Sequence, residues 1–298
     1  MSDTHAIISR PAAITILLVT ATLFAGNHIS ARFAFDDGTG LLLAILARGL
    51  TALFLMLAIA WQQKASFAIP KGQKKWVFTL GILIAAQSLC LYSAIVRIPV
   101  AMALLLVNTW PMMFILTSWA MGKKQPNIKT FILLGFILAG LFMVLDIHVA
   151  TELGAEKQLG IILGLLAALF LATTMWLTQY HLHALPGSVR SSYTMMTVVI
   201  VMIIAGILGA IPSGMSLPSS NQGWLGLLSL SILYGIAFTL LFVLAPKLDM
   251  ARNSPVLNFE PVASLFLGYF LLGQFLNTMQ LVGGAMVVTG IIAIGVMR

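Results

Sequence analysis

The sequence predicts an all-α membrane protein in which ten transmembrane helices form two inverted five-helix repeats. Of its 298 residues, 60% are hydrophobic and 8% are charged, whereas soluble domains usually carry about 25% charged residues. Ten apolar runs are long enough to cross a bilayer, which takes about 20 residues of helix. Short sequence matches also recur at an offset of half the chain. These observations exclude a soluble globular fold.

The apolar runs follow one another through short connections, many of which contain Pro, Gly or Asn, the residues typical of turns. The first run follows Arg10 and resembles a signal peptide. Its apolar stretch exceeds the usual length of about 7–15 residues, and no clear cleavage site follows it, so we expect it to remain as the first span. The predicted spans are 13–35, 40–61, 76–97, 100–121, 129–147, 159–181, 188–211, 223–245, 251–273 and 277–297.

The distribution of Lys and Arg predicts that both chain ends lie in the cytoplasm. With the N-terminus inside, the outer side receives only Arg97 and Lys157. Inner loops of membrane proteins carry an excess of basic residues. The net charge of +8 therefore reflects topology, and we expect a lipid bilayer and no nucleic acid as partner. The inner side receives Arg10, Lys64, Lys71, Lys74, Lys75, Lys123, Lys124, Lys129, Arg190, Lys247, Arg252 and Arg298.

The two halves of the chain share a pattern at an offset of 150 residues. VAMALLLVNTWP (100–111) aligns with MARNSPVLNFEP (250–261), and each half holds five spans. Because five is odd, the second half enters the membrane with the opposite polarity. Inverted repeats are typical of secondary transporters, whose substrate site lies at the repeat interface. The matched residues are Ala101 and Ala251, Asn108 and Asn258, Pro111 and Pro261, and Gly140 and Gly290.

This pattern divides the chain into four predicted parts. Residues 1–12 form a cytoplasmic N-terminus, and residues 13–147 form the first five-helix repeat. Residues 148–158 form a periplasmic linker, and residues 159–297 form the second five-helix repeat.

Four stretches of the chain resemble a known family of transporters. They are FAGNHISARFAF (24–35), AILARGL (44–50), NTWPMMFILTSWAMGKKQP (108–126) and NFEPVASLFLGYFLLGQFLNTMQLVGGAMVVTG (258–290). On these stretches the chain resembles an EamA-type member of the drug/metabolite transporter superfamily. The resemblance implies ten helices in two inverted halves. It also implies that spans 1–4 and 6–9 surround a central cavity, with spans 5 and 10 at the periphery.

The end of the chain departs from this family's usual pattern at one position. The usual ending is a Glu-Pro pair, then a Gly-Glu pair, then a Gly-rich last helix. Glu260-Pro261 and Gly283-Gly284 follow that pattern, whereas Gly273-Gln274 stands where Gly-Glu is common. The departure argues against a second carboxylate in the site and leaves the fold unaffected.

Two prolines lie inside predicted spans at matched positions. A proline deletes one backbone hydrogen bond and frees the carbonyl four residues earlier. Pro111 would free the carbonyl of Val107, and Pro261 that of Leu257. Free carbonyls at membrane depth need protein or a watery cavity around them. We expect a helix break at both prolines, which forms either a polar notch at the midplane or a kink for packing.

Charged side chains also lie inside the spans, where each costs at least about 2.5–3.5 kcal/mol at the bilayer centre. Glu260 is either a cavity-facing carboxylate that recognises an amine or takes up a proton, or a structural tie between the halves. Arg48 could hold a substrate carboxylate, brace freed carbonyls or pair with Glu260. Arg32 lies four residues before Asp36, and we expect a local ion pair at the end of that helix.

The remaining candidate cavity residues are polar or aromatic side chains on the spans expected to surround the cavity. Amides and imidazoles in membrane helices form interhelical hydrogen bonds, and aromatic faces bind cationic or amphipathic substrates. Packing is the alternative role for each of them. GIILG (160–164) is a G-x-x-x-G spacing, which predicts close helix packing. The candidates are Asn27, His28, Tyr92, Asn108, Trp110, Trp176, Asn258 and Phe259.

We expect a secondary transporter in a bacterial inner membrane that exports small organic metabolites such as amino acids. Its two halves would rock about a midplane site, which gives alternating access. The export direction and the cargo come from the resemblance alone. The chain has no nucleotide-binding motif, so we expect no direct use of ATP, and we expect no cofactor and no metal site. A proton or a counter-substrate are both candidates for the coupled species, and the oligomeric state stays open.

Two other functions rank lower. A strict exchanger of phosphorylated or nucleotide-linked sugars would favour several basic residues facing the cavity, whereas only Arg48 and Arg32 lie more than two residues from the end of a span. An intramembrane enzyme needs a cluster of acids, histidines or metal ligands. Only Glu260, among eight acidic residues, lies away from the ends of a span, so we do not expect an enzyme. A membrane protein without flux ranks equally low.

Overall fold

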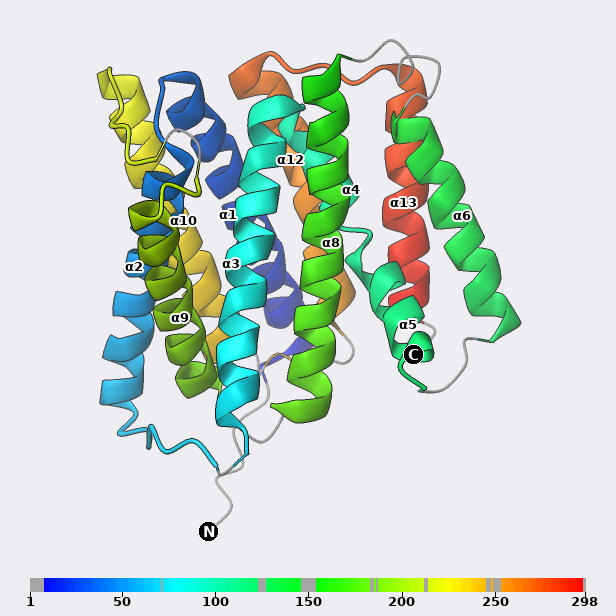
Figure 1. Ribbon diagram of the computed structural model, residues 1–298. Helices are drawn as coiled ribbons and strands as arrows, with labels where there is room; N and C mark the ends of the chain where they lie inside the picture. The colour runs from blue at the N-terminus through cyan, green and yellow to red at the C-terminus, as the bar shows by residue number, and fades with distance from the viewer. Residues whose placement is uncertain are drawn as a thin grey trace.

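The structure is a computed structural model (Figure 1). Every element in the part of the chain that it describes is helical. The described residues are 8–70, 72–122, 127–145, 154–182, 185, 187–211, 214–244, 248 and 253–296. The predicted inner residues Lys71, Lys123, Lys124, Lys247, Arg252 and Arg298 lie outside these ranges, as does most of the predicted linker. The elements are α1 (Arg10–Asp36), α2 (Leu41–Gln62), α3 (Lys74–Arg97), α4 (Val100–Val107), α5 (Trp110–Ala120), α6 (Ile128–Leu145), α8 (Ala155–His181), α9 (Gly187–Ile207), α10 (Asn221–Leu244), η2 (Ser254–Phe259), α12 (Glu260–Leu272) and α13 (Thr278–Val296).

Ten apolar helical segments follow one another in the predicted order. The fourth consists of α4 and α5, and the ninth consists of η2 and α12. Seven of the segments are long and apolar enough to cross a membrane. The other three are shorter apolar helices, namely α6, the ninth segment and α13. The prediction of an all-α fold with several membrane spans is therefore confirmed for the described residues.

The two halves of the chain interleave. Each helix of the first half has a helix of the second half as its main neighbour: α1 packs along α10, α3 along α8, α2 along α9, and α6 along α13. The broken fourth segment packs against α8 and α12. In Figure 1, α6 and α13 lie side by side at one edge of the bundle. Neither half therefore forms a separate bundle.

Small residues let these helices approach closely. On α1, Ala13, Leu17, Ala21 and Ala25 are spaced four apart and fully buried, so one face of the helix packs flat against its neighbours. On α8, a Cβ added at Gly160 would lie 2.9 Å from Arg97 Cβ, which leaves no room for any side chain. The close packing predicted for the G-x-x-x-G spacing is confirmed.

The fourth segment breaks just before Pro111. Helix α4 ends at Val107, and Pro111 occupies the second position of α5. Two side chains at the break bond to carbonyls of α4 that also accept backbone N–H groups. Asn108 Nδ2 donates to the Leu104 carbonyl (2.8 Å), and Thr109 Oγ1 donates to the Leu106 carbonyl (2.7 Å). The polar side chains at this break therefore bond within their own segment.

The ninth segment changes helix type just before Pro261. Residues 254–259 form the 3-10 helix η2, and α12 begins at Glu260 with Pro261 in its second position. The Leu257 carbonyl, which a proline four residues later leaves without its α-helical donor, accepts the backbone N–H of Glu260 instead. The break therefore positions Glu260 in the first turn of α12.

Asp37 ties the end of α1 to the start of α10. Its Oδ2 accepts the backbone N–H groups of Ser219 and Ser220, both at 2.8 Å. The backbone N–H of Ser220, followed by the other donors of the two serines, holds the pKa of the Asp37 carboxyl below its usual range. This contact joins two loops that are distant in the sequence.

Candidate functional site

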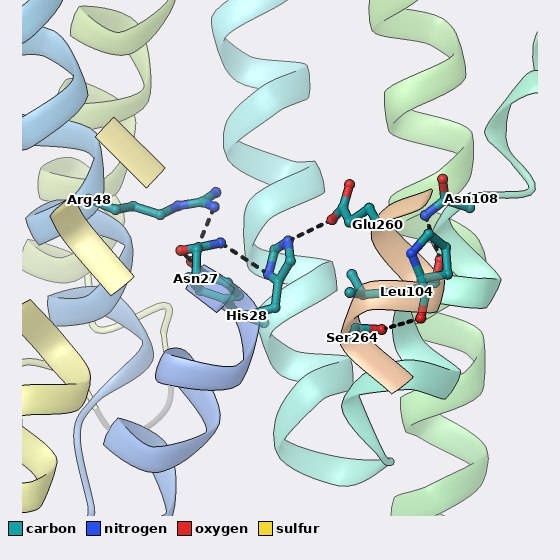
Figure 2. Close-up of polar contacts among 9 residues, drawn as sticks. Asn27, His28, Arg48, Leu104, Asn108, Glu260 and Ser264 are labelled. Carbon is teal, nitrogen blue, oxygen red and sulfur yellow. Dashed lines mark hydrogen bonds and ion pairs between the residues drawn. The ribbon is translucent and has the colours of Figure 1, made fainter. Parts of the chain in front are cut away.

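Four helices bring five of the predicted site residues together. Asn27 and His28 lie on α1, Arg48 on α2 and Glu260 on α12 (Figure 2). Tyr92 lies on α3. Asn27 and Tyr92 are 0% exposed, and His28 and Arg48 are 5% exposed. Polar groups buried this deeply are stable only when they are hydrogen-bonded. We call these five residues the polar relay.

The members of the polar relay are joined by successive polar contacts. Arg48 Nη1 donates to the Tyr92 hydroxyl at 3.2 Å, and that hydroxyl donates to Asn27 Oδ1 at 3.0 Å. Asn27 Nδ2 lies 3.3 Å from His28 Nδ1. His28 Nε2 lies 3.3 Å from Glu260 Oε1. The chain of contacts therefore runs from a guanidinium on α2 to a carboxylate on α12, and it links the two halves of the sequence.

The guanidinium of Arg48 is held without a carboxylate. Its Nη2 donates to the Ser88 hydroxyl, and its central carbon lies 4.5 Å from the ring centre of Tyr92 and 4.3 Å from that of Tyr234. Cation–π contacts of this kind stabilise a desolvated cation by up to about 2 kcal/mol. Within the described ranges no acidic side chain lies at ion-pair distance from Arg48. The site therefore holds one buried cation that lacks an anionic partner.

Two residues complete this environment, Ser88 and Tyr234, although they did not stand out from other polar and aromatic residues of the spans. Ser88 lies four residues before Tyr92 on α3, so both face the same side of that helix and both contact Arg48. The four-residue spacing of Ser88 and Tyr92 was the feature of the sequence that could have predicted the role of Ser88. For Tyr234 the sequence offers no comparable signal, because its role depends on how α10 packs beside α2.

The predicted residues at the fourth-segment break lie apart from the relay contacts. Asn108 is 6% exposed, and its side chain bonds within its own segment to Leu104. Trp110 is half-buried at the start of α5. Figure 2 shows Asn108 beyond Glu260, on the side away from His28.

Three other candidates also lie apart from the relay contacts. Trp176 packs beside Tyr180 and His181, with ring centres 5.4 and 5.3 Å away, near the end of α8. Asn258 is half-buried, and Phe259 is 36% exposed. These three residues belong to other surfaces of α8 and η2 in this structure.

The ion pair expected for Arg32 is confirmed. Arg32 Nε lies 2.9 Å from Asp36 Oδ1. Its Nη1 also donates to the carbonyls of Ile95 and Val96, at 2.7 and 3.1 Å. These carbonyls belong to the last turn of α3, where a cation is favourable because the helix dipole is negative there. Arg32 therefore fastens α1 to α3 and is not part of the relay.

Gln274, which replaces the family's common Glu, has a structural contact. Its Oε1 accepts the backbone N–H of Val100 at 3.0 Å. Val100 opens α4, so the Gln274 amide satisfies one of the unpaired donors at that helix start. The contact needs only an oxygen, which a neutral amide supplies.

Comparison with known proteins identifies the family. The sequence model of the EamA-like transporter family matches residues 11–146 and residues 158–296. The chain belongs to the EamA-like transporter family. An uncharacterized transporter of Archaeoglobus fulgidus (strain ATCC 49558 / DSM 4304 / JCM 9628 / NBRC 100126 / VC-16) is 27% identical over 201 residues, which are 67% of this chain and 68% of the relative.

A solved crystal structure of another protein has the same fold as this EamA-like transporter. It matches with a TM-score of 0.63 and 17% sequence identity, over 95% of this chain and 96% of the other. Family membership makes this EamA-like transporter a multi-pass membrane transporter. A buried polar relay in such a protein has two chemical capacities: its guanidinium can bind an anion, and its imidazole and carboxylate can bind a proton or an amine.

Proposed function

We propose that this EamA-like transporter is a secondary exporter of small organic metabolites such as amino acids, and that Arg48 binds the cargo carboxylate. The observation that carries the proposal is the buried guanidinium of Arg48, 5% exposed and without an acidic partner among the described residues. Burying a charge is costly unless it is paired. A carboxylate fits the guanidinium because two parallel N–H···O bonds can form.

The other end of the polar relay supplies the second recognition element. Glu260 lies next to His28 and is 20% exposed, so its carboxylate retains access to a further partner. That partner is either an amine of the cargo or a proton shared with His28. A sugar-phosphate exchanger would favour several cations at the site, and Arg48 is the sole arginine or lysine of the relay. The exchanger therefore remains second.

The halves are, in this proposal, inverted repeats spanning 13–147 and 159–297, with a linker at 148–158. Support comes from the matched glycines at the contact of α6 with α13. A Cβ added at Gly140 would lie 2.8 Å from Met286 Cβ and 3.1 Å from Val287 N. A Cβ added at Gly290 would lie 2.5 Å from Ile137 and 3.3 Å from Phe136. At the offset of 150 residues, Phe136 and Ile137 correspond to Met286 and Val287. Each glycine therefore contacts the counterparts of the residues that the other glycine contacts.

Packing between helices supports the same symmetry. When each segment is replaced by its counterpart in the other half, the pair α1–α10 becomes α8–α3, and both are observed. In the pairs α2–α9 and α6–α13 each helix is the counterpart of the other, so the replacement leaves these pairs unchanged. The contact of α1 with the ninth segment becomes the contact of α8 with the fourth, which is also observed.

Interleaving also defines what would move during alternating access. Interleaving argues against rocking of the two halves as rigid bodies, because each helix packs mainly on the other half. The packing favours two mixed groups: α1, α10 and α12 on one side, and α3, α8 and the α4–α5 segment on the other. The polar relay crosses between these groups through Tyr92, Asn27 and His28. Motion of one group against the other would open the site to one side at a time.

The transport experiment uses the full chain in liposomes and three probes of similar size: propionate, L-alanine and n-propylamine. We expect counterflow of propionate and L-alanine that Arg48→Lys reduces strongly, because an ammonium cannot bind a carboxylate bidentately. The matched control, Arg32→Lys, changes an arginine that fastens helix ends and should retain flux. Counterflow of n-propylamine that depends on Glu260 would assign the carboxylate to amine recognition. If the flux of all three probes is the same in Arg48→Lys as in wild type, the proposal is overturned.

We further propose that both termini face the cytoplasm of a bacterium, with the protein in the inner membrane. The basic residues Arg10, Lys64 and Lys74 lie on the side predicted to be inside. After Cys90 is replaced, Lys74→Cys should resist an impermeant thiol reagent in intact cells, and Glu156→Cys should react. The opposite labelling pattern would reverse the orientation.

A further inference from the structure

We propose that the polar relay is directional and couples the binding of a carboxylate at Arg48 to the protonation of His28. Asn27 and Tyr92 act as positioning residues in this device. The inference rests on the proposed function, since the carboxylate at Arg48 is part of it. It adds a coupled ion, the proton, which would cross the membrane in the same direction as the cargo, so that export would follow the outward gradient of the cargo.

The direction of the relay follows from the chemistry of its first member. An arginine only donates hydrogen bonds. The Tyr92 oxygen therefore accepts from Arg48 Nη1 (3.2 Å), and its own proton goes to Asn27 Oδ1 (3.0 Å). The amide group of Asn27 then presents its Nδ2, a donor, to His28 Nδ1 (3.3 Å). In the proposed relay His28 Nδ1 accepts this proton, and the imidazole carries its own proton on Nε2, 3.3 Å from Glu260 Oε1.

This arrangement opposes a charged His28. An imidazolium carries protons on both nitrogens, so its Nδ1–H would face the donor group of Asn27. Rotating the Asn27 amide would relieve that clash but would leave the Tyr92 proton without its acceptor. All these groups are buried, so a lost partner is not replaced by water. Arg48 therefore keeps His28 neutral through two intervening side chains.

A carboxylate bound at Arg48 removes the constraint. The guanidinium and the Tyr92 hydroxyl then both donate to the cargo. Asn27 can rotate so that Nδ2 donates to the Tyr92 oxygen and Oδ1 accepts the Nδ1–H of His28. One proton leaves a hydronium ion of the aqueous phase to which the site is open, and forms the new N–H bond at Nδ1. All donors of the reversed relay again have acceptors, and His28 still donates to Glu260.

The charges around His28 favour this coupling. In the part of the chain that the structure describes, two titratable groups contact His28, Tyr92 from α3 and Glu260 from α12. The next ones are Arg48 from α2, which contacts Tyr92, and Tyr234 from α10, which contacts Arg48. Helix α4 and η2 contain no charged residue. Without cargo, Arg48 and Glu260 balance each other. A monocarboxylate adds one negative charge, and a proton on His28 restores neutrality in a buried site, where unbalanced charge is costly.

The test observes His28 directly by 15N NMR of the full chain labelled at histidine, with His28→Gln to assign the signal. We expect a neutral imidazole protonated at Nε2 without cargo. Adding propionate at fixed pH should convert the signal of His28 to that of an imidazole protonated at both nitrogens. Tyr92→Phe frees Asn27, so this signal should be present without propionate, and propionate should change it little. The matched control Tyr193→Phe, whose hydroxyl donates to the Phe67 carbonyl outside the relay, should behave as wild type.

A second variant keeps the test decisive if Tyr92→Phe does not fold. Asn27→Asp places a carboxylate that can accept from both Tyr92 and His28, so His28 should be doubly protonated without propionate. An imidazolium in the empty wild-type protein would overturn the relay. So would Arg48-dependent thermal stabilisation by propionate with an unchanged His28 spectrum, which would leave the proposed function standing. Absence of any Arg48-dependent stabilisation by propionate would instead remove the anion site itself.

Discussion

Residues 108–111 and 258–261 share the pattern Asn-x-x-Pro, and both mark a break in an apolar segment, yet they serve different ends. The first break is sealed: α4 is buried along its whole length, and Asn108 bonds to its own segment. The second break is engaged with the rest of the protein, because Glu260 contacts His28 on α1. The same sequence pattern accompanies a break that bonds within its own segment in one half and a carboxylate that contacts another helix in the other half.

The comparison extends to the whole site. At the offset of 150 residues, Leu177, Thr178, Val198 and Trp110 stand where Asn27, His28, Arg48 and Glu260 form the relay. His28, Arg48 and Glu260 therefore each have an uncharged counterpart in the other half. Backbone breaks and close helix contacts are shared by both halves, since both halves need them to pack. Charge is placed once, because every buried charge lowers stability and a single site is enough for one coupled cargo.

The largest expected effect separates the two breaks by function. Glu260→Gln keeps the side-chain shape and removes the charge, so it should abolish flux of propionate driven by a pH gradient in liposomes. Trp110→Phe, its counterpart in the first break, should retain that flux. Both variants should elute as monodisperse protein with a thermal midpoint near that of wild type. Full flux in Glu260→Gln would show that the two breaks do not differ in proton coupling.

The next effect concerns stability and has an unusual sign. Replacing a buried ion group with an apolar side chain of similar volume stabilises a protein by about 1–4 kcal/mol in favourable cases. Arg48→Met should therefore raise the thermal midpoint while it removes stabilisation by propionate. Val198→Ala, at the matched buried position, should lower the midpoint by an amount equivalent to about 2 kcal/mol. A large loss of stability in Arg48→Met would mean that Arg48 is a structural brace.

Matched glycines should respond alike. Gly140→Ala and Gly290→Ala each place a Cβ within 2.7 Å or less of an atom on the facing helix. Overpacking of this kind costs about 1–3 kcal/mol. We expect similar losses in thermal midpoint for the two variants, with flux unaffected relative to the remaining folded protein. A loss confined to one of them would argue against symmetric packing of α6 and α13.

Matched asparagines should respond differently. Asn108 donates to the Leu104 carbonyl, and its loss in Asn108→Ala should cost about 0.5–1.5 kcal/mol, as for one buried hydrogen bond. Asn258 is half-buried and makes no side-chain hydrogen bond within the described part of the chain, so Asn258→Ala should change the thermal midpoint less. Equal effects in a thermal unfolding assay would mean that both asparagines are structural.

The smallest effect lies outside the relay, at the loop contact of Asp37. The pKa of this carboxyl is lower in the folded protein than its usual value of about 4. Ionised Asp37 thus stabilises the fold at pH values above about 4, and this contribution is lost as the pH falls toward the folded value. Asp37→Asn should lower the thermal midpoint at neutral pH, and the two proteins should converge in acid. A gap that widens in acid would contradict the assignment. The matched position, Gly187, carries no carboxylate.

Local features of the fold were predictable from the sequence. The second span was expected at 40–61 and α2 occupies Leu41–Gln62, because the length of an apolar run is a local property. The two breaks were expected at Pro111 and Pro261, because the loss of a backbone donor is equally local. Glu260 and Arg48 stood out for the same reason: a charge within an apolar run has a high cost and calls for a partner.

By itself, then, the sequence determined which segments are helical and apolar, where two of them break, and which buried charges need an explanation. Only the tertiary structure decided that the halves interleave, that Glu260 pairs with His28, and that Tyr234 covers the Arg48 guanidinium. His28 and Glu260 are far apart in the chain, and lipid-soluble helices of similar composition can pack in many orders. Which helices pack together depends on side-chain shape at close range, where a glycine or an alanine leaves room for one neighbouring helix and not for another.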